Sequence, residues 1–188
     1  MNASFQSFKN HFLIAMPSLT EGIFAHSVTY VCEHTEQGAM GIVINQPMGM
    51  PLSDVLDHLK IDDARAHLND PVMAGGPVQT DRGFVLHRTG DQRWESTMVI
   101  TDEVSLTTSR DILASMAHAE GPYDSLVALG YAGWDAGQLE EEIADNAWLT
   151  LPADSDIIFT VPVEQRLDAA AAKLGINMSL LAPGAGHA

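Results

Sequence analysis

The residues best suited to chemistry cluster between positions 130 and 150, which read GYAGWDAGQLEEEIADNAWLT. The pattern predicts one short helix, because Asp135 can serve as its N-cap and Gln138, three residues later, can complete a capping box. At 100° per residue, one side of this helix should form an apolar stripe that faces the core. The stripe comprises Ala136, Leu139, Ile143 and Ala147.

The three successive glutamates of this helix are not equivalent. Glu141 points away from the apolar stripe, whereas Glu140 lies on its shoulder, where a carboxylate loses hydration unless it finds a donor. One interpretation is structural: Glu140 and Gln138 bond nearby backbone amides and fix the glycine-rich turn. The other is functional: Glu140 lies at the rim of a groove walled by Trp134 or Trp148. We favour the structural interpretation.

A thiol and an imidazole occur close together in the segment SVTYVCEH, residues 27–34. If this segment is a strand, Cys32 and His34 project to the same side and Glu33 to the other. An adjacent imidazole can promote the thiolate, which is the reactive form of cysteine. Cys32 is therefore a candidate reactive thiol, and a buried, inert cysteine is the alternative.

Other constellations give weaker signals. The eight histidines show no tight ligand spacing and the chain has one cysteine, so we predict no metal site and no cofactor. The glycines of MAGGPV could cradle an anion, but the P-loop lysine and the third glycine of a dinucleotide fingerprint are missing, so Gly75, Gly76 and Pro77 more simply make a tight turn. No nucleophile elbow is present. Whether the protein is an enzyme stays open, and the sequence favours a non-enzymatic protein.

The elements that must position these residues alternate between strands and helices. A hairpin through Gly38 is the clearest β signal, and Pro162 and Gly175 should open and close the last helix. The segment 62–70 is either a loop or a further turn of helix. We expect strands over residues 11–17, 27–34, 39–47, 71–74, 82–88, 96–101, 124–133 and 156–162. We expect helices over residues 51–61, 107–121, 135–147 and 163–175.

Composition indicates one globular domain spanning residues 1–188. The hydrophobic fraction is 46% and the charged fraction 18%, which is typical of a folded chain. Cys32 is the only cysteine, so an intramolecular disulfide is impossible. The first seventeen residues contain neither a signal peptide nor a membrane span. We therefore expect a cytoplasmic protein that is not associated with membranes.

The charge balance bears on possible partners. Nine basic and 25 acidic residues give a formal net charge of −16. Nucleic-acid binding depends on lysine and arginine displacing counterions from phosphate, so direct binding of DNA or RNA is disfavoured. A local basic patch formed by Arg82, Arg88 and Arg93 stays open as an exception.

Five motifs in one order make the sequence resemble the AlgH/YqgE family of bacterial proteins. They are HFLIAMPSL, VCEHTEQGAMGIVINQP, MAGGPVQTDRGFVLH, ALGYAGWDAGQLEEEIADNAWL and the closing GHA. The resemblance implies a single α+β domain with a bent, mostly antiparallel sheet that forms a pseudo-barrel and helices packed outside it. The matching motif positions are Glu33, His34, Gly41, Asn45, Pro47, Gly75, Gly76, Pro77, His87, Trp134, Gln138, Glu140, Glu142 and Trp148.

The resemblance supplies no catalytic role for these positions. Gln46 and Leu167 depart from the family, which often has arginine and tryptophan there; the first change removes a possible anion contact. Some members of the family are labelled transcriptional regulators. That label fits poorly with the acidic charge and the lack of a helix-turn-helix pattern.

Three hypotheses about function follow. The first is a non-enzymatic binding or regulatory module that recognises an unknown protein or small molecule between the Cys32 hairpin and the segment from Trp134 to Trp148. The second is a redox-responsive thiol protein or an enzyme that uses Cys32 with His34 or Glu33. The third is a transcriptional regulator, as the family label suggests. The oligomeric state is left open.

Overall fold

A ten-stranded sheet forms the centre of the molecule in the computed structural model, which describes residues 4–19, 22–61, 70–122 and 124–181. The strands follow the order β10-β1-β2-β3-β9-β6-β8-β7, and β5 joins β4 to β9. The strands are β1 (His11–Ala15), β2 (Val28–Thr35), β3 (Gly38–Val43), β4 (Pro47–Pro51), β5 (Pro71–Ala74), β6 (Val78–Arg88), β7 (Thr97–Val99), β8 (Val104–Thr107), β9 (Ser125–Asp135) and β10 (Trp148–Pro152).

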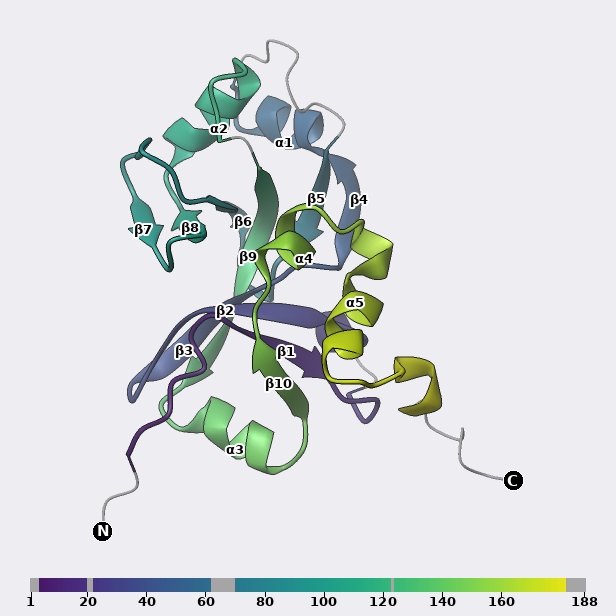
Figure 1. Ribbon diagram of the computed structural model, residues 1–188. Helices are drawn as coiled ribbons and strands as arrows, with labels where there is room; N and C mark the ends of the chain where they lie inside the picture. Colours follow the sequence, from purple (N-terminus) through teal and green to yellow (C-terminus); the bar gives the residue numbers. More distant parts are fainter. Residues whose placement is uncertain (1–3, 20–21, 62–69, 123, 182–188) are drawn as a thin grey trace.

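The sheet is curled into a half-barrel with helices on its outside (Figure 1). All of its pairings are antiparallel except the one between β5 and β9. The α-helices are α1 (Leu52–His58), α2 (Arg110–Ala117), α3 (Gln138–Ala144), α4 (Ser155–Phe159) and α5 (Arg166–Lys173). Short 3₁₀ helices are η1 (Gly22–Phe24), η2 (Val163–Gln165) and η3 (Met178–Leu181). The fold is thus the α+β pseudo-barrel that the family resemblance implies.

Strand β9 joins the two halves of the sheet (Figure 1). One half contains β1, β2, β3 and β10, and the other contains β4 to β8. Along one edge it pairs with β6, and along the other it pairs first with β5 and then with β3. The change of partner occurs near Gly130, whose φ of 79° is readily adopted only by glycine. The two halves of the sheet therefore share one continuous strand.

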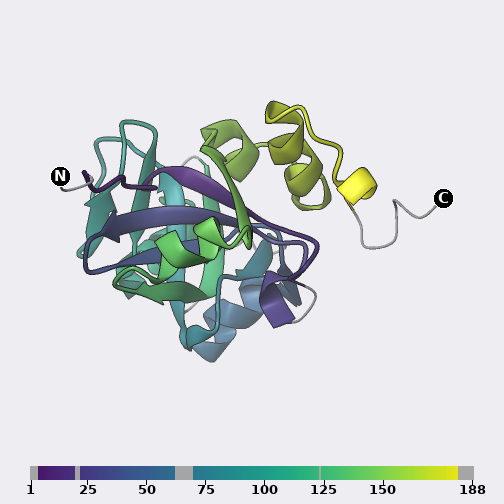
Figure 2. The same cartoon turned by 90° about the horizontal axis from the view of Figure 1, so that it is seen from below.

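Alternating side chains distribute the core over both faces of the strands. On β1, Phe12 and Ile14 belong to the central cluster covered by α4 and α5, whereas Leu13 belongs to the cluster under α3. A third cluster lies between the helices α1 and α2 and the strands β5, β6 and β9, and it includes Val85 and Val127. Figure 2 shows α4 and α5 together at one side of the sheet and α3 on another face.

Most predicted elements are confirmed, including the hairpin through Gly38 and the last helix with Gly175 behind it. One strand prediction is wrong. Residues 156–159 of the predicted strand 156–162 belong to the helix α4, because the side chain of Asp154 accepts a hydrogen bond from the backbone N–H of Asp156 and caps a helical turn. Strands β4, β8 and β10 were not predicted. Most of the segment 62–70 and the motif GHA lie outside the described residues.

Candidate functional site

A β-bulge separates the two side chains that were expected to form a reactive pair. Val31 pairs with Gly41 but Glu33 pairs with Met40, so Cys32 is an extra residue in β2. After the bulge, the side chains of β2 point to the opposite faces from those that strict alternation would give. Cys32 packs in the central cluster, whereas the His34 ring stacks on Phe8 beside the cluster under α3. The prediction that Cys32 and His34 share a face is therefore wrong.

The surroundings of Cys32 are those of a buried core residue. Its side chain is fully buried, and the thiol donates to the carbonyl oxygen of Tyr30 at 3.8 Å. Burial raises the pKa of the Cys32 thiol well above its usual value, and the negative charge of Glu33 adds to this effect. The thiolate is therefore disfavoured, which is the opposite of what an activated cysteine requires.

His34 instead links the N-terminal segment to α3. Its Nδ1 accepts a hydrogen bond from the backbone N–H of Phe8 at 2.8 Å, which leaves Nε2 to carry the ring proton. That Nε2–H donates to the carboxylate of Glu140, while Ser7 Oγ donates to the carbonyl of His34. The His34 side chain is fully buried and that of Glu140 is 38% exposed. Glu140 thus binds an imidazole rather than the backbone amides predicted for it.

Glu142 was identified from the sequence only as a motif position, yet it holds two tryptophans. The indole N–H groups of Trp134 and Trp148 both point to Glu142 Oε1, each at 3.4 Å, and the two rings meet edge to face. Both indoles are nearly buried, so each N–H needs an acceptor nearby. The sequence has a tryptophan before α3 and another after it. Their need for an acceptor was the signal that could have identified Glu142.

The start of α3 differs from the predicted capping box. Gly137, with φ of 78°, is the N-cap, and Asp135 is the last residue of β9. The prediction of Asp135 as the cap is wrong, and Ala136 is exposed rather than part of the apolar stripe. The reciprocal contact is present: Gln138 Oε1 accepts a hydrogen bond from the backbone N–H of Asp135 at 3.0 Å. Gln138 therefore fastens α3 to the end of β9.

Asn45 connects the end of β3 to the segment before β2. Its Oδ1 accepts from the backbone N–H of Val28 at 2.8 Å, and its Nδ2 donates to the carbonyl of His26 at 2.9 Å. The neighbouring Gln46 donates to the carbonyl of Ala25 at 3.0 Å. Both amides thus complete backbone hydrogen bonds across a turn.

The Gly75-Gly76-Pro77 turn packs directly against β9. A Cβ atom on Gly76 would lie 2.0 Å from the carbonyl carbon of Tyr131, so only glycine allows this approach. The Gly75 N–H donates to Leu129 and its carbonyl accepts from Val43. Gly75 therefore joins two strands through its backbone.

The candidate residues are thus spread over several parts of the sheet. Glu33 and Trp134 contribute to one cavity of about 240 Å³ beside the hairpin of β2 and β3. Neither Glu140 nor Asn45 lines that cavity, and the turn at Gly75 lies at the seam between β5 and β9. Within the described ranges, no three histidine, cysteine, aspartate or glutamate side chains are grouped so as to hold a metal ion.

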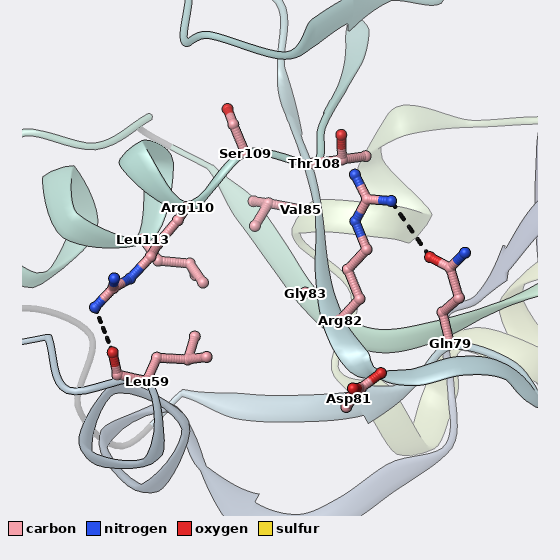
Figure 3. Close-up of a pocket in the computed structure, with 10 residues that line it drawn as sticks. All are labelled: Leu59, Gln79, Asp81, Arg82, Gly83, Val85, Thr108, Ser109, Arg110 and Leu113. Carbon is pink, nitrogen blue, oxygen red and sulfur yellow. Dashed lines mark hydrogen bonds between the residues drawn. The ribbon is translucent and has the colours of Figure 1, made fainter.

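Two larger cavities lie along β6 and were not predicted from the sequence, although Arg82 and Trp134 were considered in other contexts. Val78 pairs with Tyr131 and Gly83 with Leu129, so four residues, 79–82, stand opposite the single Gly130. This large bulge carries Gln79 and Arg82 away from the ladder. One cavity of about 330 Å³, the α2 cavity, is lined by Leu59, Gln79, Asp81, Arg82, Gly83, Val85, Thr108, Ser109, Arg110 and Leu113 (Figure 3).

The second cavity, the Trp134 cavity, has a volume of about 620 Å³ and adjoins the first. The two share Gln79, Arg82 and Thr108. Its lining comprises Ala39, Met40, Val78, Gln79, Arg82, Phe84, Thr108, Tyr131, Gly133, Trp134 and Asp135.

The three arginines considered as a basic patch are separated. Arg82 and Arg88 are six residues apart on β6, roughly 20 Å at the rise of a strand. Arg88 donates to Asp124 at 3.1 Å and to Asp156 at 2.9 Å, so its charge is neutralised. Arg93 contacts backbone carbonyls of its own loop. The structure therefore contains no patch made of these three residues.

His87 is a further motif residue with a defined environment. Its Nδ1–H donates to the carbonyl of Arg88 at 3.0 Å, so Nε2 accepts from the Thr107 hydroxyl at 2.8 Å. Burial lowers the pKa of His87. The imidazole is a neutral brace between β6 and β8.

The fold and these contacts define a class of α+β protein: a curled half-barrel whose polar motif residues fasten its strands and helices. A family model described as AlgH-like matches residues 12–179. A UPF0301 protein of Thioalkalivibrio sulfidiphilus is 61% identical over 188 residues, covering 100% of both chains. The UPF0301 protein AlgH of Pseudomonas aeruginosa is 56% identical over 183 residues, covering 96% of this chain and 95% of that protein. The chain belongs to the AlgH-like family.

Two solved structures support the same conclusion about the fold. The solution structure of AlgH from Pseudomonas aeruginosa matches with a TM-score of 0.80 and 53% identity, covering 100% of both chains. A crystal structure of a Corynebacterium diphtheriae protein matches with a TM-score of 0.72 at 18% identity, covering 97% of this chain and 94% of that one. Among the described residues, no helix is long and apolar enough to cross a membrane.

Proposed function

We propose that the protein is a non-enzymatic binding module that recognises a small molecule in the adjoining cavities along β6 and acts in regulation. The observation that carries this proposal is the pair of cavities, of about 330 and 620 Å³, that share Gln79, Arg82 and Thr108. Cavities of this size are typical of sites for small ligands. The acidic composition fits a cytoplasmic location, which belongs to the same proposal.

The use of the motif side chains supports a binding module rather than an enzyme. His34 and Glu140 bind each other, and Glu142 accepts from two indoles. Cys32 is buried with a raised thiol pKa. A catalytic acid, base or nucleophile must reach its substrate, and these groups are directed to other parts of the protein instead.

The test is an NMR titration of the ¹⁵N-labelled protein with a small-molecule extract of bacterial cells. We expect saturable shifts of backbone amides that line either cavity. Thr108→Trp places a large ring where the two cavities meet and should abolish these shifts. Glu141→Trp, on the exposed side of α3, is the matched control and should leave them unchanged. An extract that shifts no cavity amide, or shifts that persist in Thr108→Trp, would contradict the proposal.

A protein partner is the second candidate, and one observation favours it. The cavity beside the β2–β3 hairpin is lined by exposed Glu33 and by Trp134. Affinity capture from a lysate should then recover a partner that Glu33→Lys releases and Glu141→Lys retains. A partner held equally by both variants would exclude the hairpin as its binding surface.

A further inference from the structure

The basic residues of this acidic chain are mostly engaged with acidic groups or with the backbone. Arg88 pairs with Asp124 and Asp156, and Lys173 pairs with Asp154 at 2.5 Å. The buried Arg166 donates to the carbonyl of Ile44 at 2.5 Å and to that of Val161 at 3.0 Å. These three side chains therefore connect different parts of the fold.

Arg82 and Arg110 pair with no acidic side chain of the described residues, although both make other contacts. Arg82 donates to the side-chain oxygen of Gln79 at 3.3 Å, and its guanidinium carbon lies 5.6 Å from the centre of the Phe84 ring. Arg110 donates to the carbonyl of Leu59. In the part of the chain that the structure describes, no carboxylate forms an ion pair with either guanidinium. Both arginines line the same α2 cavity, although they come from β6 and α2. Two cations without a carboxylate partner thus converge on one cavity of a protein with a net charge of −16.

The arrangement of the α2 cavity suggests what lies between these cations. Figure 3 shows the two guanidinium groups on opposite sides, with Val85 and Leu113 between them and the Thr108 hydroxyl beside Arg82. Asp81 also lines the cavity, and in Figure 3 its side chain lies below Arg82 rather than between the two arginines. The central part is therefore apolar and its flanks are positive.

We propose that the α2 cavity binds a small organic anion, a carboxylate or phosphate ester with a compact apolar body. A guanidinium presents paired N–H donors that match the oxygens of carboxylate or phosphate. The side chains of Val85 and Leu113 suit the apolar body, and a volume of about 330 Å³ suits a compact ligand. This inference rests on the proposed binding function and names the ligand class for one of the two cavities.

The experiment is a titration of ¹⁵N-labelled protein with phenyl phosphate, benzoate, inorganic phosphate and benzyl alcohol. We expect phenyl phosphate and benzoate to shift the amides of Gly83, Ser109 and Arg110 in a saturable way. Inorganic phosphate lacks the apolar body and benzyl alcohol lacks the charge, so both should bind at least about tenfold more weakly. Equal binding of benzyl alcohol would overturn the proposal. Binding of inorganic phosphate alone, without the organic anions, would also overturn it.

Two variants test the role of the arginines. Arg82→Gln and Arg110→Gln should each weaken phenyl phosphate about tenfold, because each removes a charge-assisted hydrogen bond. Arg93→Gln is the matched control, since Arg93 is exposed, donates to backbone carbonyls of its own loop and does not line the α2 cavity. The amide spectrum of each variant verifies folding, and Arg82→Lys and Arg110→Lys, which keep the charge, should bind better than the glutamine variants. Unchanged affinity in both glutamine variants would contradict the proposal.

The outcomes separate this inference from the proposed function. If the cell extract shifts amides of the Trp134 cavity while no organic anion shifts those of the α2 cavity, the anion site is refuted and the binding function stands. If the extract shifts neither cavity, the proposed function fails. In that case, saturable binding of phenyl phosphate that depends on Arg82 and Arg110 would still support the anion site.

Discussion

At the scale of single residues, the polar motif side chains bind other parts of the same chain. His34 donates to Glu140, Glu142 accepts from two indoles, and Asn45 completes two backbone hydrogen bonds. A buried polar group that is left without its partner costs free energy, so each of these contacts should contribute to stability. Three of the described buried polar atoms, including Glu142 Oε2, have no hydrogen-bond partner.

Glu140→Ala should lower the free energy of unfolding by about 1 to 2 kcal/mol, because it leaves the buried Nε2–H of His34 without an acceptor. Glu141→Ala is the matched control on the same helix, and its exposed side chain should change stability by less than about 0.5 kcal/mol. Urea unfolding measures both values. Equal losses in the two variants would show that the His34 contact contributes nothing.

His87 should make stability dependent on pH. Its pKa is lowered in the folded protein, whereas in the unfolded chain the imidazole titrates at its ordinary value of 6.5. The unfolded state therefore binds a proton first as pH falls. The stabilising contribution is present above about pH 6.5 and is lost below it, by up to about 1.4 kcal/mol per pH unit.

This pH dependence can be measured by urea unfolding at pH 7 and pH 5.5. His87→Gln should reduce the difference between the two pH values, even if it lowers stability at both. His118→Gln, at an exposed position behind α2, should keep the full difference. If the stability difference between pH 7 and pH 5.5 persisted in His87→Gln and vanished in His118→Gln, it would come from His118 and the prediction for His87 would be wrong.

At the scale of elements, the hydrophobic patterns predicted most of the helices and strands, and the errors have physical causes. Residues 156–162 are apolar enough for either structure, and the cap at Asp154 determines the helix. Strand β4 begins and ends with proline and, among the described strands, pairs with β5 alone, so it lacks the usual β pattern. Most of the short strand β8 lies between the predicted strand over residues 96–101 and the predicted helix over residues 107–121, and it was assigned to neither.

The candidate site was less predictable than the fold. The bulge at Cys32 changes which face His34 occupies, and the bulge at residues 79–82 brings Arg82 to a cavity. A bulge depends on how two distant strands pair, which no local pattern records. The family motifs included Glu142, but its role required the two tryptophans to be placed around it.

Gly76→Ala should destabilise the seam between β5 and β9 strongly. The added Cβ would meet the backbone of Tyr131 at 2.0 Å, and a backbone contact of this kind cannot be relieved by a side-chain rotation. We expect a loss of about 3 kcal/mol or more in urea unfolding. Gly90→Ala is the control, because nothing lies within 4 Å of its Cβ. A loss below about 1 kcal/mol for Gly76→Ala would mean that the turn packs more loosely than described.

At the scale of the whole molecule, charge limits the choice of partner. The net charge of −16 opposes the approach of a polyanion, and Arg88, one of the three arginines considered for a patch, is neutralised by two aspartates. A regulatory role would then act through a ligand or a protein. The α2 cavity can still accept a small anion, because its two arginines act at contact distance.

Fluorescence anisotropy with a labelled DNA duplex should show no binding even at low ionic strength, where electrostatic attraction is strongest. A basic protein of similar size that binds DNA serves as the positive control. An affinity for DNA that rises steeply as the salt concentration is lowered would contradict this expectation and favour a transcriptional regulator that binds DNA directly.

The continuous strand β9 has a consequence for how the molecule opens. Residues 127–129 of β9 pair along both edges, with β5 and β6, and residues 132–135 pair with β3, so opening either half of the sheet disrupts this one strand. Hydrogen–deuterium exchange should therefore find the slowest amides in β9, with rates that follow global unfolding. The protein should behave as one cooperative unit, and its two halves should melt together.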